Sequence, residues 1–214
     1  MNKLDTILFD LDGTLIDSNG LIIDSFKYVF NEALPFVKLT DADYQSFIGP
    51  TLWASFSKYE KDKDKVDELV LLYRRHNNAH HDSVLAFDGA LSLLKNLKEK
   101  GYKVGVVSSK MRYLVLRGLE ITGLMPYVDV VVGMDEVENH KPNPESLLLA
   151  MKLVKGKYGM YVGDHPADIL AGKNASMLTC GVGYSWHKTL KDVGPDYMIN
   201  HLMELLQLLE DYYV

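Results

Sequence analysis

The sequence contains a single cysteine, Cys180, so the chain cannot form an internal disulfide bond. It lacks any apolar run close to the roughly 20 residues that a membrane-spanning helix requires. Its first ten residues include Lys3 but no apolar segment typical of a secretory signal. We therefore expect a cytoplasmic protein without a membrane partner, in which Cys180 is a small buried residue.

Basic residues are outnumbered in this chain. Lys and Arg total 23 against 29 Asp and Glu, which gives a formal net charge of −6. A surface that binds nucleic acid or an anionic membrane needs a basic excess, so we expect neither partner. The length of 214 residues, with 47% hydrophobic and 24% charged residues, is typical of one folded domain or of a core with a smaller insertion.

Short apolar runs alternate with helical patterns over most of the chain. The expected strands are Thr6–Phe9, Lys103–Val107, Val128–Val132, Tyr158–Val162, Leu178–Val182 and Tyr197–Ile199. The expected helices are Gly89–Lys100, Arg112–Thr122, Glu145–Lys155, Pro166–Ala175 and His201–Tyr212. This alternation predicts an α/β fold, a Rossmann-like parallel sheet with helices on both faces.

One segment breaks the alternation. Residues 18–82 contain no convincing strand, and their apolar positions Val66, Leu69, Val70 and Tyr73 follow helical spacing. We therefore predict a core of residues 1–17 and 83–214, interrupted by an all-helical domain of residues 18–82.

Polar residues follow several of the expected strands. In chain order they are Asp10, Asp12, Ser108, Ser109, Lys141, Asp164 and Asp168. In an open parallel sheet, ligands bind beyond the carboxyl ends of the strands, so these residues should lie together. Several carboxylates and one ammonium at one edge favour a hard cation such as Mg²⁺ and a phosphoryl group. Gly13 would let the backbone turn there, so that its amides approach an anion.

Four segments that carry these residues resemble the ordered motifs of the haloacid dehalogenase (HAD) superfamily phosphatases. They are Asp10-Leu11-Asp12-Gly13-Thr14, Val106-Val107-Ser108-Ser109-Lys110, Lys141-Pro142 and Gly163-Asp164-His165-Pro166-Ala167-Asp168. The resemblance covers essentially the whole chain and implies that the helical insertion is the family's small α-helical cap. The closest likeness is to the bacterial pyrophosphatase and phosphoglycolate phosphatase branch, on segments such as Phe47-Ile48-Gly49-Pro50-Thr51-Leu52 and Lys141-Pro142-Asn143-Pro144-Glu145.

The resemblance also implies a role for each site residue. Asp10 would be the nucleophile that forms an aspartyl-phosphate, and Asp12 the general acid and base. Mg²⁺ would be held by Asp10, the backbone carbonyl of Asp12 and Asp164, with Asp168 orienting these ligands. Ser108 and Lys141 would bind and neutralise the transferring group. The residues expected to bind phosphate or substrate are Leu11, Gly13, Ser109, Gly49, Pro50 and Thr51, the last three in a cap loop.

These expectations point to a phosphohydrolase that acts on a small phosphorylated molecule, with pyrophosphate and 2-phosphoglycolate as the first candidates. A sugar phosphomutase of the same superfamily remains an alternative because it keeps both Asp10 and Asp12. A phospho-receiver domain or a binder without catalysis belongs to another class. The receiver has no insertion after its first strand, and the presence of Asp10, Asp12, Lys141 and Asp164 argues against lost catalysis. We expect a monomer or a homodimer.

Overall fold

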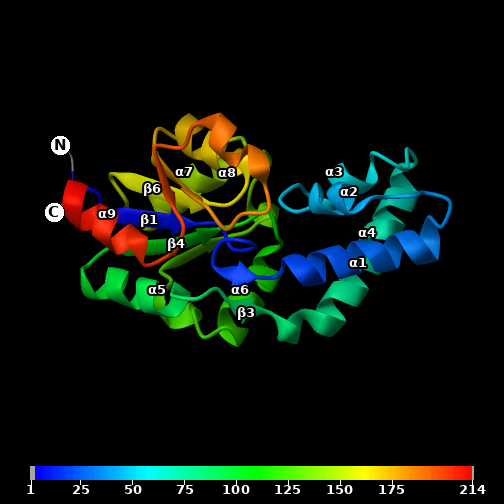
Figure 1. The fold of residues 1–214 in the computed structure, drawn as a ribbon, viewed down its shortest axis with the longest axis horizontal. Helices are drawn as coiled ribbons and strands as arrows, with labels where there is room; N and C mark the ends of the chain where they lie inside the picture. The colour runs from blue at the N-terminus through cyan, green and yellow to red at the C-terminus, as the bar shows by residue number, and fades with distance from the viewer. Residues whose placement is uncertain (1–2, 214) are drawn as a thin grey trace. The chain divides into compact units, whose positions relative to one another are not determined.

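The chain divides into two compact units in a computed structural model that describes residues 3–213 (Figure 1). One unit comprises Met1–Asp17 and Leu85–Val214, and is called the core here. The other comprises Ser18–Val84 and is called the helical unit. The predicted α/β class is confirmed.

The core is built on a six-stranded sheet with the order β5-β4-β1-β6-β7-β8. Its strands are β1 (Thr6–Phe9), β4 (Lys103–Val107), β5 (Val130–Val132), β6 (Gly159–Gly163), β7 (Leu178–Val182) and β8 (Tyr197–Ile199). All five neighbouring pairs are parallel. β1 is fully buried and lies between β4 and β6, with Phe9 level with Val106 on one side and Val162 on the other. The most apolar runs therefore form the centre of the sheet.

Helices cover both faces of this sheet (Figure 1). They are α5 (Ala90–Glu99), α6 (Arg112–Ile121), α7 (Glu145–Leu153), α8 (Pro166–Asn174) and α9 (Glu204–Tyr213). The core also contains the 3₁₀ turns η2 (Met125–Tyr127), η3 (Met134–Glu136) and η4 (Lys188–Val193), whereas η1 (His81–Ser83) lies in the helical unit. In α5, the buried residues Leu93, Leu94 and Leu97 form the face that packs on the sheet.

Helix α8 begins with a reciprocal cap between His165 and Asp168. His165 is its N-cap and accepts a hydrogen bond from the backbone N–H of Ala167, while Asp168 accepts one from the N–H of His165. Pro166 occupies the first turn, where its missing N–H has no cost. This reciprocal cap fixes the position of Asp168 close after the end of β6, the strand that precedes α8.

Two expected elements begin two or more residues later than predicted. Strand β5 begins at Val130, because the Asp129 carboxylate accepts the N–H of Val104 at 2.8 Å in place of a ladder partner. Helix α9 begins at Glu204, because its carboxylate accepts the N–H of Asn200 at 2.9 Å and holds the preceding residues in a turn.

One β-ribbon in the core was not predicted from the sequence. Strands β2 (Ile16–Asp17) and β3 (Leu85–Ala86) pair antiparallel, with Ile16 opposite Ala86. Each strand has two residues, which is too short to show the period-2 alternation that identifies a strand. The ribbon joins the two chain segments that lead into and out of the helical unit.

The helical unit contains α1 (Asn19–Ala33), α2 (Asp41–Gln45), α3 (Leu52–Phe56) and α4 (Lys63–His80). Aromatic rings fill its interior: Phe26 lies 4.6 Å from Phe47, 5.2 Å from Phe56 and 4.7 Å from Tyr73 between ring centroids. Such ring contacts add to the stabilisation from burial. The unit therefore has a hydrophobic core of its own.

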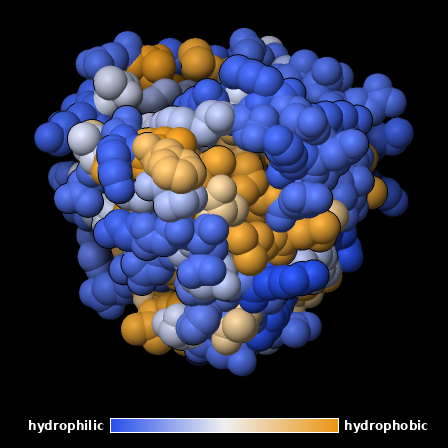
Figure 2. Space-filling model, turned by 90° about the vertical axis from the view of Figure 1, so that its right-hand side faces the viewer, coloured by the Kyte–Doolittle hydropathy of each residue, from blue (hydrophilic) through white to orange (hydrophobic). Residues whose placement is uncertain are grey.

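The surface seen in Figure 2 is mainly hydrophilic, with apolar side chains gathered in patches. Phe36 and Leu71 are the most exposed large apolar side chains of the helical unit, at 95% and 54%. No helix within residues 3–213 has both the length and the apolar character needed to cross a membrane.

Candidate active site

Three adjacent strands end in polar residues at one edge of the sheet. Asp10 follows β1, Ser108 follows β4, and Asp164 follows β6, all in the core. The backbone N–H of Asp10 donates to Val162 at 2.8 Å, and that of Ser108 donates to Val132 at 3.0 Å. The sheet hydrogen bonds thus extend into the site and fix these residues against one another.

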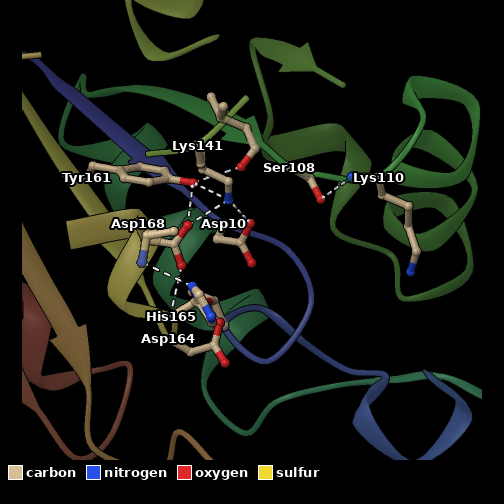
Figure 3. Close-up of polar contacts among 11 residues, drawn as sticks. Asp10, Ser108, Lys110, Lys141, Tyr161, Asp164, His165 and Asp168 are labelled. Carbon is tan, nitrogen blue, oxygen red and sulfur yellow. Dashed lines mark hydrogen bonds and ion pairs between the residues drawn. The ribbon is translucent and has the colours of Figure 1, made fainter. Parts of the chain in front are cut away.

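Lys141 lies at the centre of this cluster (Figure 3). Its ammonium donates to Asp10 Oδ1 at 2.6 Å, to Asp168 Oδ1 at 2.6 Å and to the hydroxyl of Tyr161 at 3.1 Å. Only 6% of the Lys141 side chain is exposed. Lys141 lies in the loop before α7. The fold places it next to Asp10 although the two residues are 131 positions apart in the chain.

Tyr161 is a site residue that the sequence analysis missed. Its hydroxyl donates to the carbonyl of Val107 at 2.8 Å and accepts from Lys141, so it links the end of β4 to the ammonium. With Asp10 and Asp168, it gives the three N–H bonds of Lys141 one acceptor each. No signal in the apolar run of β6 distinguishes this tyrosine from a packing residue.

Three carboxylates lie close enough to share one cation. One oxygen each from Asp10, Asp164 and Asp168 lies within 4.8 Å of the others, and all three residues are buried. Asp168 uses one oxygen for Lys141 and the other for the His165 N–H. Asp164 Oδ2 is buried and has no hydrogen-bond partner among the described residues. That orphaned oxygen and its neighbours are the hard donors that fit a divalent cation such as Mg²⁺.

This cluster holds three buried carboxylates and one buried ammonium. Burial raises the pKa of Asp10 to about 7, with Lys141 opposing the rise and Asp168 adding to it. Burial, followed by Asp10 and Asp168, raises the pKa of Asp164 well above its usual value. Burial would lower the pKa of Lys141, but Asp10 and Asp168 raise it well above the usual value. A divalent cation would offset the remaining negative charge.

The turn after Asp10 is shaped by its backbone. The carbonyl of Leu11 accepts from the N–H groups of Leu15 at 2.9 Å and Ile16 at 3.0 Å, and the Leu11 side chain is fully buried. Gly13 has φ +81°, and its N–H donates to the carbonyl of Ile16 at 2.9 Å. Gly13 therefore contributes the sharp turn, while its N–H is committed within the loop.

This turn lies directly against Asp164. A Cβ on Gly13 would overlap the Asp164 carboxylate, so glycine is required for the close approach. Thr14 Oγ1 lies 3.5 Å from Asp164 Oδ1, and Ser185 Oγ donates to the Asp164 carbonyl at 2.5 Å. Residues after β1 and β7 thus hold Asp164 from both sides.

Asp12 forms an ion pair of its own. Lys110 Nζ lies 2.7 Å from Asp12 Oδ1, although the sequence analysis gave Lys110 no role. Ser108 is buried, and its Oγ accepts the backbone N–H of Lys110 at 3.2 Å. Ser109 is half-buried in the same loop. The core therefore brings together Asp10, Asp12, Ser108, Lys141, Asp164 and Asp168.

The expected substrate loop lies in the helical unit, outside this core cluster. Gly49 has φ +101°, a conformation that favours glycine, and Pro50 is half-buried. Thr51 is the N-cap of α3, and its hydroxyl accepts the N–H of Ala54 at 3.2 Å. Thr51 thus has a structural role within its own unit.

The sequence and the fold are similar to those of proteins from one family. The model of the family "Haloacid dehalogenase-like hydrolase" matches residues 7–182. Pyrophosphatase PpaX from Listeria monocytogenes is 40% identical over 214 residues, which is 98% of each chain. A predicted phosphatase from Clostridium acetobutylicum superposes with a TM-score of 0.86 at 28% identity, covering 98% of this chain and 100% of that structure. A predicted phosphoglycolate phosphatase from Haemophilus somnus shares the fold, with a TM-score of 0.83 at 20% identity over 97% and 99%.

The family match spans most of the chain and includes the site residues Asp10, Asp12, Ser108, Lys141, Asp164 and Asp168. The relative at 40% identity extends the likeness over nearly the full length, including the helical unit. The chain therefore belongs to the haloacid dehalogenase-like hydrolase family and is an enzyme of its phosphatase class.

Proposed function

We propose that this enzyme is a Mg²⁺-dependent pyrophosphatase that works through an aspartyl-phosphate on Asp10, with 2-phosphoglycolate as the second candidate substrate. The observation that carries the reaction is the Asp10 carboxylate, held by Lys141 at 2.6 Å beside the unpartnered oxygen of Asp164. The choice of pyrophosphate is supported by the 40% identity to pyrophosphatase PpaX over 98% of both chains.

Asp10 is the proposed nucleophile. Lys141 donates to one of its oxygens, which leaves the other to attack phosphorus in line and form the acyl phosphate. Ser108 follows the neighbouring strand and supplies a hydroxyl for a phosphoryl oxygen. The ammonium of Lys141 offsets charge on both the carboxylate and the phosphoryl group.

Asp12 is the proposed general acid and base. It protonates the leaving oxygen in the first step and takes a proton from the attacking water in the second. The residues that would hold Mg²⁺ are Asp10, Asp164 and the backbone carbonyl of Asp12, with Asp168 as their orienting neighbour. When bound, Mg²⁺ neutralises carboxylate and phosphoryl oxygens and makes phosphorus more electrophilic.

Residues 18–82 are the proposed cap, inserted into a core of residues 1–17 and 83–214. The loop of Gly49, Pro50 and Thr51 is its proposed contact with substrate, together with Ser109 and Leu11 of the core. Gly13, whose N–H donates to Ile16, shapes the turn beside them. A small cap that closes on the site admits small phosphorylated molecules and excludes macromolecules.

The substrate is tested by the steady-state release of phosphate at neutral pH with Mg²⁺. Pyrophosphate, 2-phosphoglycolate, sugar phosphates and nucleotides are assayed in parallel. We expect pyrophosphate to exceed the others by more than about tenfold in kcat/KM, which is about 1.4 kcal/mol at the transition state. If 2-phosphoglycolate leads and pyrophosphate is inert, the pyrophosphatase proposal is wrong. Isomerisation of a sugar phosphate without phosphate release would instead indicate a phosphomutase.

The metal is tested by binding as well as by activity. Adding Mg²⁺ at a hundred times its Kd should stabilise the EDTA-treated protein by about 2.7 kcal/mol, measured by thermal or denaturant unfolding. Asp164→Asn removes the carboxylate whose oxygen has no hydrogen-bond partner, so we expect the affinity for Mg²⁺ to fall about 10- to 100-fold. The exposed Asp192→Asn serves as the matched control. Equal Mg²⁺ stabilisation of Asp164→Asn and the wild type would exclude Asp164 as a ligand.

A further inference from the structure

Lys110 forms an ion pair with Asp12 but has no role in the proposed mechanism. Its ammonium lies on the carboxylate of Asp12 at 2.7 Å, and the two side chains are only 13% and 15% exposed. Asp12 takes one of the three N–H donors of this ammonium. Among residues 3–213, no other hydrogen-bond acceptor lies on Lys110 Nζ.

The backbone of Lys110 is fixed from both sides. Its N–H donates to Ser108 Oγ at 3.2 Å, and its carbonyl accepts the N–H of Met134 at 2.9 Å. Figure 3 shows Lys110 leaving the end of the strand beyond Ser108, away from Lys141. A lysine anchored in this way presents its charge at a defined place, at lower entropic cost than a free surface lysine.

The two lysines of the site serve different ends of a substrate. Lys141 contacts the carboxylate of Asp10, the proposed nucleophile, and each of the three N–H donors of Lys141 has an acceptor. Lys110 contacts Asp12, the group that protonates the leaving oxygen. A leaving oxygen within about 3 Å of Asp12 Oδ1, as proton transfer requires, lies within roughly 6 Å of Lys110 Nζ.

We infer that Lys110 is a specificity-determining residue that binds an anionic leaving group beside Asp12. This inference rests on the proposed function and deepens it. The bond from an Asp10 oxygen to phosphorus forms as the bond from phosphorus to the bridging oxygen breaks. The electron pair stays on that oxygen, which takes the proton of Asp12. With pyrophosphate the departing group is a phosphate, whose remaining oxygens accept the N–H donors of Lys110 and share its charge.

The test compares leaving groups in Lys110→Met, which keeps an unbranched side chain of nearly the same length and removes its charge. Phosphate release is measured with pyrophosphate and with phenyl phosphate, whose leaving group carries no charge beyond the breaking bond. We expect kcat/KM for pyrophosphate to fall about 10- to 100-fold, the range of a charge-assisted hydrogen bond. The ratio of the two kcat/KM values should fall at least about tenfold. Lys98→Met, which breaks the Lys98–Asp129 pair elsewhere in the core, is the matched control.

A binding measurement separates this inference from the proposed function. In an Asp10→Asn background, calorimetry with Mg²⁺ compares methylenediphosphonate, which has a second phosphonate, with methylphosphonate, which has none. Lys110→Met should weaken the binding of methylenediphosphonate about 10- to 100-fold and reduce the difference in affinity between the two ligands. A parallel loss for both ligands and both substrates would mean that Lys110 acts only by positioning Asp12, and would overturn the inference. No loss for any would also overturn it. A wild type that hydrolyses neither phosphate refutes the proposed function, while the calorimetry still decides the role of Lys110.

Discussion

Asp10→Asn is expected to lower phosphate release by at least about a thousandfold, because a neutral amide cannot attack phosphorus and removing a nucleophile removes the whole covalent route. The side chain keeps its shape, and an amide oxygen can still accept from Lys141 at the place of Asp10 Oδ1. The three buried carboxylates become two, so the free energy of unfolding should not fall. The measurement is steady-state turnover of the best substrate, with unfolding followed in parallel.

The aspartyl-phosphate itself can be observed. Acid quenching of the wild type during turnover should trap phosphate on the protein, in a bond that hydroxylamine cleaves, and Asp10→Asn should trap none. Asp10→Ala excludes rescue by deamidation of the asparagine, and Asp192→Asn controls for the loss of one acidic residue. An Asp10→Asn protein that retains more than a few per cent of wild-type turnover would contradict the assignment of Asp10.

The sequence was sufficient for the sheet because its strands are buried on both faces. Such strands read as continuous apolar runs, and β1, β4, β7 and β8 have the predicted bounds. Polar residues that interrupt the end of an apolar run are equally visible, so Asp10, Asp164 and Ser108 could be predicted to meet at one edge. The parallel topology from β1 to β7 then follows from the helices between successive strands, whereas β8 is reached through the 3₁₀ turn η4 alone.

The role of Tyr161 in the site and the ion pair of Lys110 could not be predicted from the sequence. The side chain of Tyr161 belongs to a buried strand, and only the position of Val107 and Lys141 around its hydroxyl gives it a role. Lys110 closes an expected motif, but its partner Asp12 is 98 positions away in the chain. Ion pairs across such separations depend on the registers of neighbouring strands, which a single sequence does not specify.

Lys141→Met should lower both the turnover and the stability of the protein. Lys141 is the counter-charge for Asp10 and Asp168, and the exposed fractions of these side chains are 6%, 8% and 1%. Removing one partner of a buried ion pair costs about 3–5 kcal/mol, because the other charges stay buried without compensation. Turnover should fall by at least about a hundredfold, the lower range for losing a group that stabilises transition-state charge. Denaturant unfolding in EDTA gives the stability without a contribution from Mg²⁺.

The double variant Lys141→Met with Asp168→Asn distinguishes charge balance from simple loss of packing. If the cost comes from uncompensated carboxylates, removing the Asp168 charge should restore part of the stability, seen as a coupling free energy in the double-mutant cycle. Turnover should stay low, because the ammonium next to Asp10 is still missing. Lys98→Met breaks the half-exposed pair with Asp129 and should change the free energy of unfolding by only about 0–1 kcal/mol. A Lys141→Met protein as stable as Lys98→Met would show that the buried carboxylates of Asp10 and Asp168 do not depend on Lys141.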